Sequence, residues 1–532
     1  MATEITETEL KYDAPQGAPL PDLADLPGVA AESDPEEQTL KAQYYDSDDL
    51  RLIRHGITLR RRTGGSDAGW HLKLPLGGDS RSEIRLPPGR ASRQVPAELA
   101  ALVRAFTRGA PLRPVAQIST VRQRRVLLDD AGASLAEVVA DDVSAQGMGD
   151  AAPLSRWQEV EVELTRGGPD LLEAADKQLR SAGLHPAGRQ TKLERALADE
   201  LSPGARPPSV GGPTAGQRRS ANGPLTARPT PRTPAADVVM AYARAQVATL
   251  MSFDPLVRRD APDAVHQMRV ATRRLRSMLS SFGPVLRRDE IEGGRHGGRG
   301  LGGELKWLGD VLGTARDAEV LDAHLQGSLE QMPPELVMGP VQARVRAHFA
   351  SVEAGARVAV LEALDSDRYL TLLDGLDRLL ADPPLTPEAR RPAAEVLPPA
   401  VRRAHRRLRR RMRRARSTPT GPDRDAALHE ARKAAKHARY SAEAVSPVFG
   451  KPARRFAKRV KKVQSALGDH HDGVVARAAT RELGVKAHLA GENAFTFGVL
   501  YEQDACRARD LEEQARRAWK QASRPSYSSW LH

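Results

Sequence analysis

The sequence contains little of what secreted or membrane-spanning proteins rely on. Of its 532 residues only one is a cysteine, Cys506, which excludes an intramolecular disulfide framework and suits a reducing compartment. The amino terminus is acidic and lacks the hydrophobic segment of a secretory signal, and no later run approaches the length of a membrane span. These absences predict a cytoplasmic protein with no membrane span.

Aromatic residues and phosphate loops are scarce as well. Aromatic side chains are 4% of the chain and do not interleave with the cations, so the stacking of nucleic-acid bases is poorly supported. No Gly-rich loop of the Walker type is evident, which disfavours an ATPase of that class. We therefore do not expect nucleic acid as a partner of this chain.

Positive charge is abundant. The chain has 81 Lys and Arg against 68 Asp and Glu, a formal charge of +13, and this excess favours anionic partners in general. Its length exceeds what one hydrophobic core normally serves, so two or three domains are expected.

One basic helix is present twice. Its first copy places a histidine and three cations at intervals of 3, 4 and 3, and its second copy repeats these types and intervals 163 positions later: His266, Arg269, Arg273 and Arg276, then His429, Arg432, Lys436 and Arg439. Residues three and four apart share one face of an α-helix, so each copy presents a column of cations. A column of this kind can be a solvated face, but its repetition favours the binding of a polyanion.

The duplication continues beyond these helices. Leu312-Gly313 and Asp317 recur as Leu467-Gly468 and Asp472, now 155 positions later, so the second copy has a shorter connection. His470 and His471 lie between Asp469 and Asp472 and could suggest a metal site. Adjacent residues on a helix point apart, however, and the interpretation without a metal there is favoured.

The amino-terminal half reads as a meander of short strands that each carry one charged face. Carboxylates cluster in the first and last strands, whereas Arg and Lys dominate between them, in stretches such as Glu7–Lys11, Thr58–Arg62, His71–Leu74, Val121–Arg124 and Glu159–Leu164. If the sheet closes with these faces inward, acids line one side of the lumen and bases another. Carboxylates suit Mg²⁺ or Mn²⁺ and cations suit phosphate, so a closed sheet holding a metal and a phosphate chain is expected.

Residues 1 to 200 resemble the CYTH family, the triphosphate tunnel metalloenzymes. The resemblance rests on Glu7-x-Glu9-x-Lys11 near the amino terminus, followed in order by the other charged strands and by Thr191-Lys192. It implies an eight-stranded antiparallel β-tunnel that hydrolyses or cyclises triphosphate-containing substrates with a divalent metal.

By the same resemblance, each charged position receives a role. Metal would be bound by Glu7, Glu9, Glu161 and Glu163, and Glu161 and Glu163 would also position the attacking water. Glu159 shares their face, so the pairs 159/161 and 161/163 stay open, and Asp141 or Asp142 could add a carboxylate. The substrate phosphates would be held by Lys11, Arg60, Arg62, Lys73, Arg122, Arg124 and Lys192.

The carboxy-terminal half is predicted to be helical. Residues 202–234 are rich in Pro, Gly, Ser, Thr and Arg and read as a flexible linker. Residues 235–522, through both copies of the basic helix and of the Leu-Gly turn, resemble the CHAD family, the conserved histidine α-helical domain. The resemblance implies two pseudo-symmetric four-helix bundles, at about 235–380 and 395–522, with a basic groove that binds inorganic polyphosphate through the two columns of cations.

The fold class expected is thus α+β in two domains, a tunnel over residues 1–201 and a helical domain over 235–522. The leading functional prediction is a metal-dependent triphosphatase, acting on inorganic triphosphate or a related short polyphosphate and tethered to a polyphosphate-binding domain. The alternative is a non-catalytic polyphosphate-binding protein associated with granules. Thiamine triphosphate, nucleoside triphosphates and cyclisation of ATP remain open for the tunnel, as does the choice between Mg²⁺ and Mn²⁺.

Overall fold

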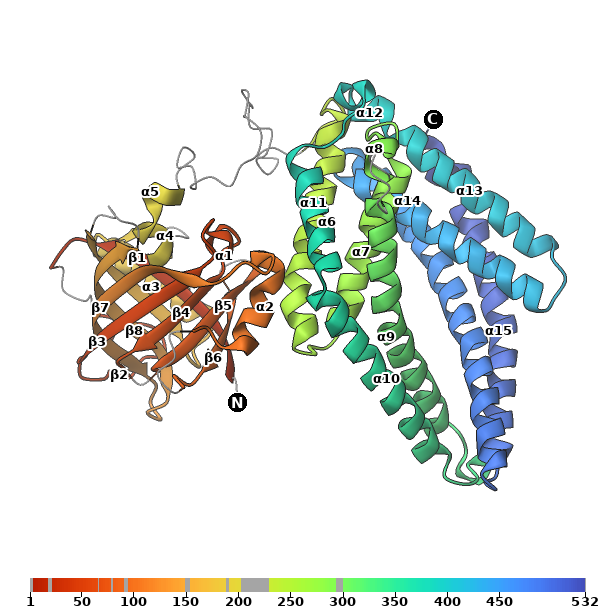
Figure 1. The fold of residues 1–532 in the computed structure, drawn as a ribbon, viewed down its shortest axis with the longest axis horizontal. Coiled ribbons are helices and arrows are strands. Elements are labelled where there is room, and N and C mark those ends of the chain that lie inside the picture. The colour runs from red at the N-terminus through yellow and green to blue at the C-terminus, as the bar shows by residue number, and fades with distance from the viewer. Residues whose placement is uncertain are drawn as a thin grey trace. The chain divides into compact units, whose positions relative to one another are not determined.

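The structure is a computed structural model that describes residues 3–17, 22–65, 67–77, 80–89, 94–148, 154–187, 191–201, 229–292 and 300–531. Of the expected linker, residues 202–228 lie outside the described residues. The chain divides into two compact units, Met1–Gly216 and Gln217–His532 (Figure 1). The first unit is built on an antiparallel sheet and the second is helical, which confirms the α+β fold class.

Eight long strands and two short ones form the sheet of the first unit. They are β1 (Thr3–Ala14), β2 (Ala31–Glu32), β3 (Glu36–Asp46), β4 (Thr58–Thr63), β5 (Gly69–Gly77), β6 (Ser80–Leu86), β7 (Arg113–Leu128), β8 (Ser134–Gly147), β9 (Leu154–Leu164) and β10 (His185–Pro186). The long strands follow the order β1-β6-β5-β4-β3-β7-β8-β9, and β9 pairs with β1 again. The sheet therefore closes into the expected eight-stranded tunnel (Figure 1).

The alternation of charged and apolar residues decides which face of this sheet points inward. In β9, Val160 and Val162 join an apolar core with Leu171 and Leu179 of α3 (Pro169–Ser181), which covers the outside of the sheet. The side chains at alternate positions point to the opposite face, so Glu161 and Glu163 face the lumen. The closed sheet thus keeps its apolar side under helices and its charges inside.

Four further helices complete the first unit: α1 (Arg51–Arg54), α2 (Ala97–Thr107), α4 (Lys192–Ala196) and α5 (Ala198–Leu201). The functionally important one is α4, because Lys192 begins it. Its N-cap is a capping box, in which the Thr191 hydroxyl accepts from the Glu194 backbone N–H (3.1 Å) and the Glu194 carboxylate accepts from the Thr191 N–H (2.6 Å). Leu193 is buried in an apolar cluster with Leu197 and Trp157, and this packing directs Lys192 into the tunnel.

In its described residues the second unit consists of helices and their connections, with two isolated β-bridges, Pro234 to Pro392 and Leu286 to Leu385. Its longer helices are α6 (Ala235–Arg258), α7 (Ala264–Ser281), α9 (Leu301–Glu330), α10 (Val341–Asp365), α11 (Asp367–Ala381), α13 (Pro398–Ser417), α14 (Pro422–Leu489) and α15 (Phe495–Ala522). Shorter pieces are α8 (Arg288–Glu292), α12 (Ala393–Val396), α16 (Pro525–Ser528) and three 3₁₀ turns, Pro334–Leu336, Pro387–Arg390 and Ser529–Leu531. No described helix is both long and apolar enough to cross a membrane.

The duplication of the sequence is visible in these helices. α14 is interrupted at Gly450, which has a φ of 59° and lies between Pro447 and Pro452, so α14 is two helical segments. α7 and α9 carry the first copies of the basic column and of the Leu-Gly motif, and the two segments of α14 carry the second copies. A single bend at Gly450 thus replaces the longer connection between α7 and α9, which explains the change of offset.

The two halves of this unit also share a core. α9 packs along α10, and α14 along α15, as two long helical hairpins (Figure 1). Leu325, Val345 and Phe349 of the first hairpin form one apolar cluster with Leu483 and Leu500 of the second. The helical unit is therefore one body with a pseudo-two-fold arrangement, as expected for paired bundles.

Candidate functional sites

The tunnel encloses a cavity of about 390 Å³ lined mainly by charged side chains. Apart from Glu7, whose side chain lies outside the described residues, all residues assigned to metal or phosphate line it: Glu9, Lys11, Arg60, Arg62, Lys73, Arg122, Arg124, Glu161, Glu163 and Lys192. Neither of the two candidates for an additional carboxylate lines it: Asp141 is buried and Asp142 is exposed. The backbone of Glu7 pairs with Arg81 of β6. The predicted set is thus gathered at one place.

The charges are segregated around the wall of the tunnel. Most acidic residues of the described lining occupy the adjacent strands β8, β9 and β1, with Lys11 of β1 among them. Arg and Lys prevail on β6, β5, β4 and β7, where Asp67, between β4 and β5, is the acidic exception. Glu9 lies directly opposite Glu163 in the β1–β9 register, at a separation where like charges repel unless a cation lies between them. This arrangement suits a metal ion on one side of the lumen and a phosphate chain on the other.

Two lysines neutralise the acidic wall. Lys192 Nζ lies 2.9 Å from Asp141, 2.5 Å from Glu159 and 2.9 Å from Glu161, and Lys11 Nζ lies 2.7 Å from Glu161. Burial disfavours the charged form of Lys11, but the carboxylates of Glu161 and Glu9 outweigh this and raise its pKa. Burial would likewise raise the pKa of Glu161, yet Lys11 and Lys192 hold it well below the usual value. Lys11 and Glu161 are therefore both ionised at neutral pH.

Asp141, Glu159 and Glu161 place one oxygen each within 4.8 Å of the others, the spacing of a metal site. Their oxygen-only donor set fits the hard cations Mg²⁺ and Mn²⁺. Asp141 also accepts a two-pronged contact from Arg122, at 2.7 Å for both bonds. Glu159 lies behind the cavity lining, where its carboxylate accepts from Trp157 Nε1 at 2.7 Å. Of the two open pairs of β9 carboxylates, both members of the 161/163 pair line the cavity, whereas only Glu161 of the 159/161 pair does.

Sequence reasoning missed the group that supports the basic wall. Glu83 of β6 is fully buried and contacts His71 (2.9 Å), Lys73 (3.8 Å) and Arg60 (3.9 Å), and it also pairs with Arg85. Burial opposes the charge of Glu83, but its hydrogen bond to His71 and the nearby Lys73 lower its pKa. Glu83 thus holds several cations toward the lumen. The alternation Glu83-Ile84-Arg85 was the one sign of this role in the sequence.

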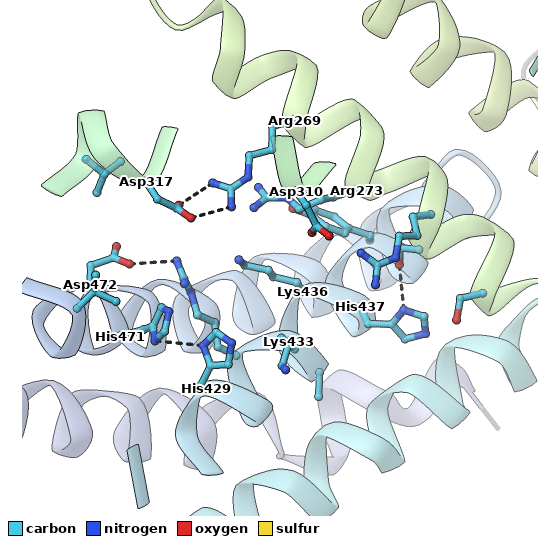
Figure 2. A pocket seen from close by; sticks show the side chains of 18 of the residues that line it. Arg269, Arg273, Asp310, Asp317, His429, Lys433, Lys436, His437, His471 and Asp472 are labelled. Atoms are coloured by element: carbon cyan, nitrogen blue, oxygen red, sulfur yellow. Dashed lines mark hydrogen bonds and ion pairs between the residues drawn. The ribbon is translucent and has the colours of Figure 1, made fainter. Parts of the chain in front are cut away.

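The helical unit has a cavity of about 560 Å³ between α7 and α14, which we call the helical cavity (Figure 2). Seven cations line it, from both repeats and from α13: Arg269, Arg273, Arg276, Arg407, Arg432, Lys433 and Lys436. Three carboxylates, Asp310, Asp317 and Asp472, share its lining. The excess of cations makes the helical cavity a candidate polyanion site.

The two repeats contribute matching ion pairs to this cavity. Arg269 donates to Asp317 at 2.8 and 3.3 Å (Figure 2). In the second repeat, Arg432 lies 3.5 Å from Asp472. Each arginine crosses the glycine of the Leu-Gly motif, since a Cβ at Gly313 would lie 3.0 Å from Arg269 Nη2, and one at Gly468 would lie 3.5 Å from Arg432 Nη2. In each repeat, the glycine therefore leaves room for the first arginine of the basic column to pass over it, and the aspartate then holds that arginine in place.

Two of the eight predicted polyphosphate residues do not line the helical cavity. Arg439 instead donates to Glu443 at 2.6 Å and to Gln464 at 3.3 Å, and His266 lies at the start of α7. The other six, Arg269, Arg273, Arg276, His429, Arg432 and Lys436, come together. Lys433, His437 and His471 line the cavity although sequence reasoning gave them no role.

The cations of the helical cavity repel one another. Burial, together with the charges of Arg432 and Arg273, lowers the pKa of Lys436 to about 7. Burial and the neighbouring His429 lower the pKa of His471 to about 4, and these two rings meet through their Nδ1 atoms at 3.1 Å (Figure 2). An anion that enters would relieve this repulsion.

Comparison with known proteins agrees with this division. A family model for the CYTH domain matches residues 6–196, and one for the CHAD domain matches residues 241–481. The protein named Uncharacterized protein Rv2226 of Mycobacterium tuberculosis (strain ATCC 25618 / H37Rv) is 38% identical over 542 residues, which cover 97% of this chain and 96% of that protein.

Two solved structures are similar to parts of the chain. PptA from Streptomyces chartreusis is 24% identical over 54% of this chain and 100% of its own, with a TM-score of 0.46. The structure described as "Putative adenylyl cyclase HpAC1 from Hippeastrum", with a dominant triphosphatase activity, is 15% identical over 37% of this chain and 98% of its own, with a TM-score of 0.23. From the two family models and the relative that matches almost end to end, the chain belongs to the proteins that join a CYTH domain, of the triphosphate tunnel family, to a CHAD domain.

Proposed function

We propose that the tunnel hydrolyses inorganic triphosphate or the end of a short polyphosphate with a divalent metal, and that the helical unit binds polyphosphate. The observation that carries the first part is the segregated lumen, in which a wall of Arg and Lys faces a wall of carboxylates. Tyr44 is the one ring side chain among the described residues that line the tunnel, so the lumen offers little to stack on a nucleoside base. This favours an inorganic phosphate chain over a nucleotide.

Within the tunnel, the proposal divides the work between the two walls. Arg60, Arg62 and Lys73 would bind the non-bridging oxygens of the phosphate chain and neutralise its charge. Glu9 and Glu163, with Glu161, would hold Mg²⁺ or Mn²⁺, which when bound lowers the pKa of water and polarises a phosphoryl oxygen. Glu161 and Glu163 would orient the water in line with the bond that breaks, and Lys11 and Lys192 would keep the Glu161 carboxylate ionised.

The test is phosphate release from inorganic triphosphate by the full chain, with and without Mg²⁺ or Mn²⁺. Glu161→Gln should lower metal-dependent turnover roughly 100-fold or more, because removal of one metal-binding carboxylate costs several kcal/mol of transition-state stabilisation. Glu173→Gln on the exposed face of α3 is the matched control and should leave turnover unchanged.

A specific observation favours a second candidate, a tunnel that binds phosphate without turnover. Lys192 Nζ already occupies the centre of the Asp141, Glu159 and Glu161 cluster, where it neutralises carboxylates that a metal would otherwise use. Absence of turnover with either metal, in protein that still binds triphosphate, would establish this non-catalytic function in place of the enzyme. A granule-associated polyphosphate-binding protein would then be the better description.

For the helical unit, the proposal rests on the six clustered residues of the two basic columns. Arg273→Ala should weaken the binding of long-chain polyphosphate roughly tenfold, because it removes a charge-assisted contact. Arg516→Ala is the control, since Arg516 is an exposed arginine of α15 that does not line the helical cavity. Equal losses in the two variants would contradict a localised site.

A further inference from the structure

A second group of metal-ligand atoms lies in the helical unit, away from the lining of the helical cavity. Asp425, near the start of α14, His470, in its second segment, and Glu512 of α15 place one ligand atom each within 4.8 Å of the others. His470 Nε2 lies 3.5 Å from Asp425 Oδ1 and 3.7 Å from Glu512 Oε1. These separations are too long for hydrogen bonds.

They are close to what a shared metal ion requires. Two ligands bound at about 2.1 Å to a tetrahedral ion are about 3.4 Å apart, the spacing that His470 Nε2 makes with each carboxylate. The two carboxylates are also held in place on their other oxygens. Asp425 Oδ2 accepts from Arg477 at 3.1 Å, and Glu512 Oε2 pairs with Arg424 at 2.8 Å. Arginines that orient carboxylates in this way act as outer partners of metal ligands.

The independent sign of a missing ligand is His470 itself. Its side chain is 2% exposed, and Nε2 has no hydrogen-bond partner among the described residues. A buried ring nitrogen without a partner costs free energy in a folded protein, and here it points between two carboxylate oxygens. In its neutral form the imidazole ring offers at Nε2 the lone pair that a metal ion needs.

We propose that Asp425, His470 and Glu512 bind a divalent transition-metal ion, Zn²⁺ or Mn²⁺, at a structural site of the helical unit. The imidazole nitrogen favours these ions over Mg²⁺ and Ca²⁺, which prefer oxygen ligands only. The ion would tie both segments of α14 to α15. His471, the next residue, lines the helical cavity, so the ion would also fix the turn that presents His471 to a polyanion.

The test uses the full chain, stripped with a chelator, reloaded and passed through a desalting column. Zn²⁺ retained is counted by elemental analysis, and the Mn²⁺ form is examined by pulsed electron paramagnetic resonance for coupling to an imidazole nitrogen. No histidine is among the described residues that line the tunnel cavity, so nitrogen coupling separates this site from the tunnel. Wild-type protein should show the coupling, and His470→Gln should lose it together with one equivalent of Zn²⁺.

Two matched variants complete the design. His471→Gln changes the adjacent histidine and should keep both the nitrogen coupling and the Zn²⁺, and Glu161→Gln in the tunnel should keep the nitrogen coupling. Arg477→Ala should weaken Zn²⁺ binding on the order of 10- to 100-fold. If His470→Gln does not fold, this variant replaces it as the test of the site. The proposal is overturned if wild-type protein shows no nitrogen coupling, if the coupling survives His470→Gln, or if His471→Gln removes it.

Discussion

Lys436 is the cation of the helical cavity whose charge depends most on pH near neutrality. Burial and the adjacent arginines lower its pKa to about 7, so in the free protein about half of these side chains are protonated at pH 7. A bound polyanion would favour the ammonium form and raise this pKa. Affinity should therefore be highest below pH 7 and fall as pH rises through 7, since binding then requires uptake of a proton.

This proton uptake can be measured by titration calorimetry with long-chain polyphosphate in buffers of different ionisation enthalpy. The wild-type chain should take up a fraction of a proton at pH 7.5. Lys436→Arg keeps the charge at every pH used and should flatten the dependence of affinity on pH. If both proteins show the same slope, the titrating group is not Lys436.

Gly313 and Gly468 occupy equivalent places in the two repeats but leave unequal space. Alanine at Gly468 would make an ordinary contact with Arg432 at 3.5 Å, so Gly468→Ala should raise helix stability by about 1 kcal/mol. The Cβ of alanine at Gly313 would lie 3.0 Å from Arg269 Nη2, so the guanidinium would have to shift by a few tenths of an ångström from its position against Asp317. Gly313→Ala should therefore weaken polyphosphate binding more than Gly468→Ala does.

The stability of the Gly313→Ala and Gly468→Ala variants can be measured by urea unfolding followed by circular dichroism. The affinity of each variant for polyphosphate tests the predicted difference in binding. Equal affinities would mean that the placement of Arg269 by Gly313 does not matter for binding.

The role of a single residue could be predicted from the sequence where a pattern repeats, but not where the role depends on contacts that form only in the folded structure. The carboxylates of β9 and the basic columns of α7 and α14 follow from spacing alone, because alternate strand residues and every third or fourth helical residue share a face. Glu83 could not be foreseen in the same way, since its partners His71 and Lys73 meet it only when β5 and β6 pair. Lys433 and His471 have Val270 and Arg316 as their counterparts, so repetition gave no signal for them.

Among the elements, α4 has a function out of proportion to its length. Its capping box fixes the helix start at Thr191 and thereby aims Lys192 at the acidic wall. Thr191→Ala should cost about 1 kcal/mol of stability and lower turnover of triphosphate, whereas Thr191→Ser keeps the hydroxyl acceptor and should restore both. Thermal unfolding and a phosphate-release assay on the three proteins test this. Normal turnover in Thr191→Ala would show that Lys192 needs no helix cap.

The closed sheet illustrates how far element-level prediction reaches. The strand positions and the single charged face of each strand follow from alternation, whereas closure into a tunnel was implied by the resemblance to the CYTH family and fits the clustering of acids at both ends of the meander. The pairing of β1 with both β6 and β9, which completes the wall, depends on backbone partners far apart in the sequence. Likewise, the bend at Gly450 was seen in the sequence only as a change of offset.

For the whole molecule, the two proposed sites predict separable activities. Arg273→Ala lies in the second unit and should leave turnover of inorganic triphosphate unchanged while it weakens binding of long polyphosphate. Glu161→Gln should do the reverse. Binding of the long chain should also weaken steeply with salt and exceed binding of DNA at equal ionic strength, because counterion release depends on the number of phosphates contacted. Equal affinity for DNA would favour a general nucleic-acid surface.

The charged lumen of the tunnel has a consequence for how this unit melts. Unfolding returns the crowded arginines and lysines of the wall to water, whereas a multivalent anion binds only when they are gathered. Triphosphate, and to a smaller degree sulfate, should therefore raise the midpoint of thermal unfolding of the first unit in proportion to the logarithm of anion concentration. A bound phosphate chain would therefore act as a removable part of the hydrophilic interior of this unit. Measurements of thermal shift would identify the anions that the tunnel prefers before any assay of turnover.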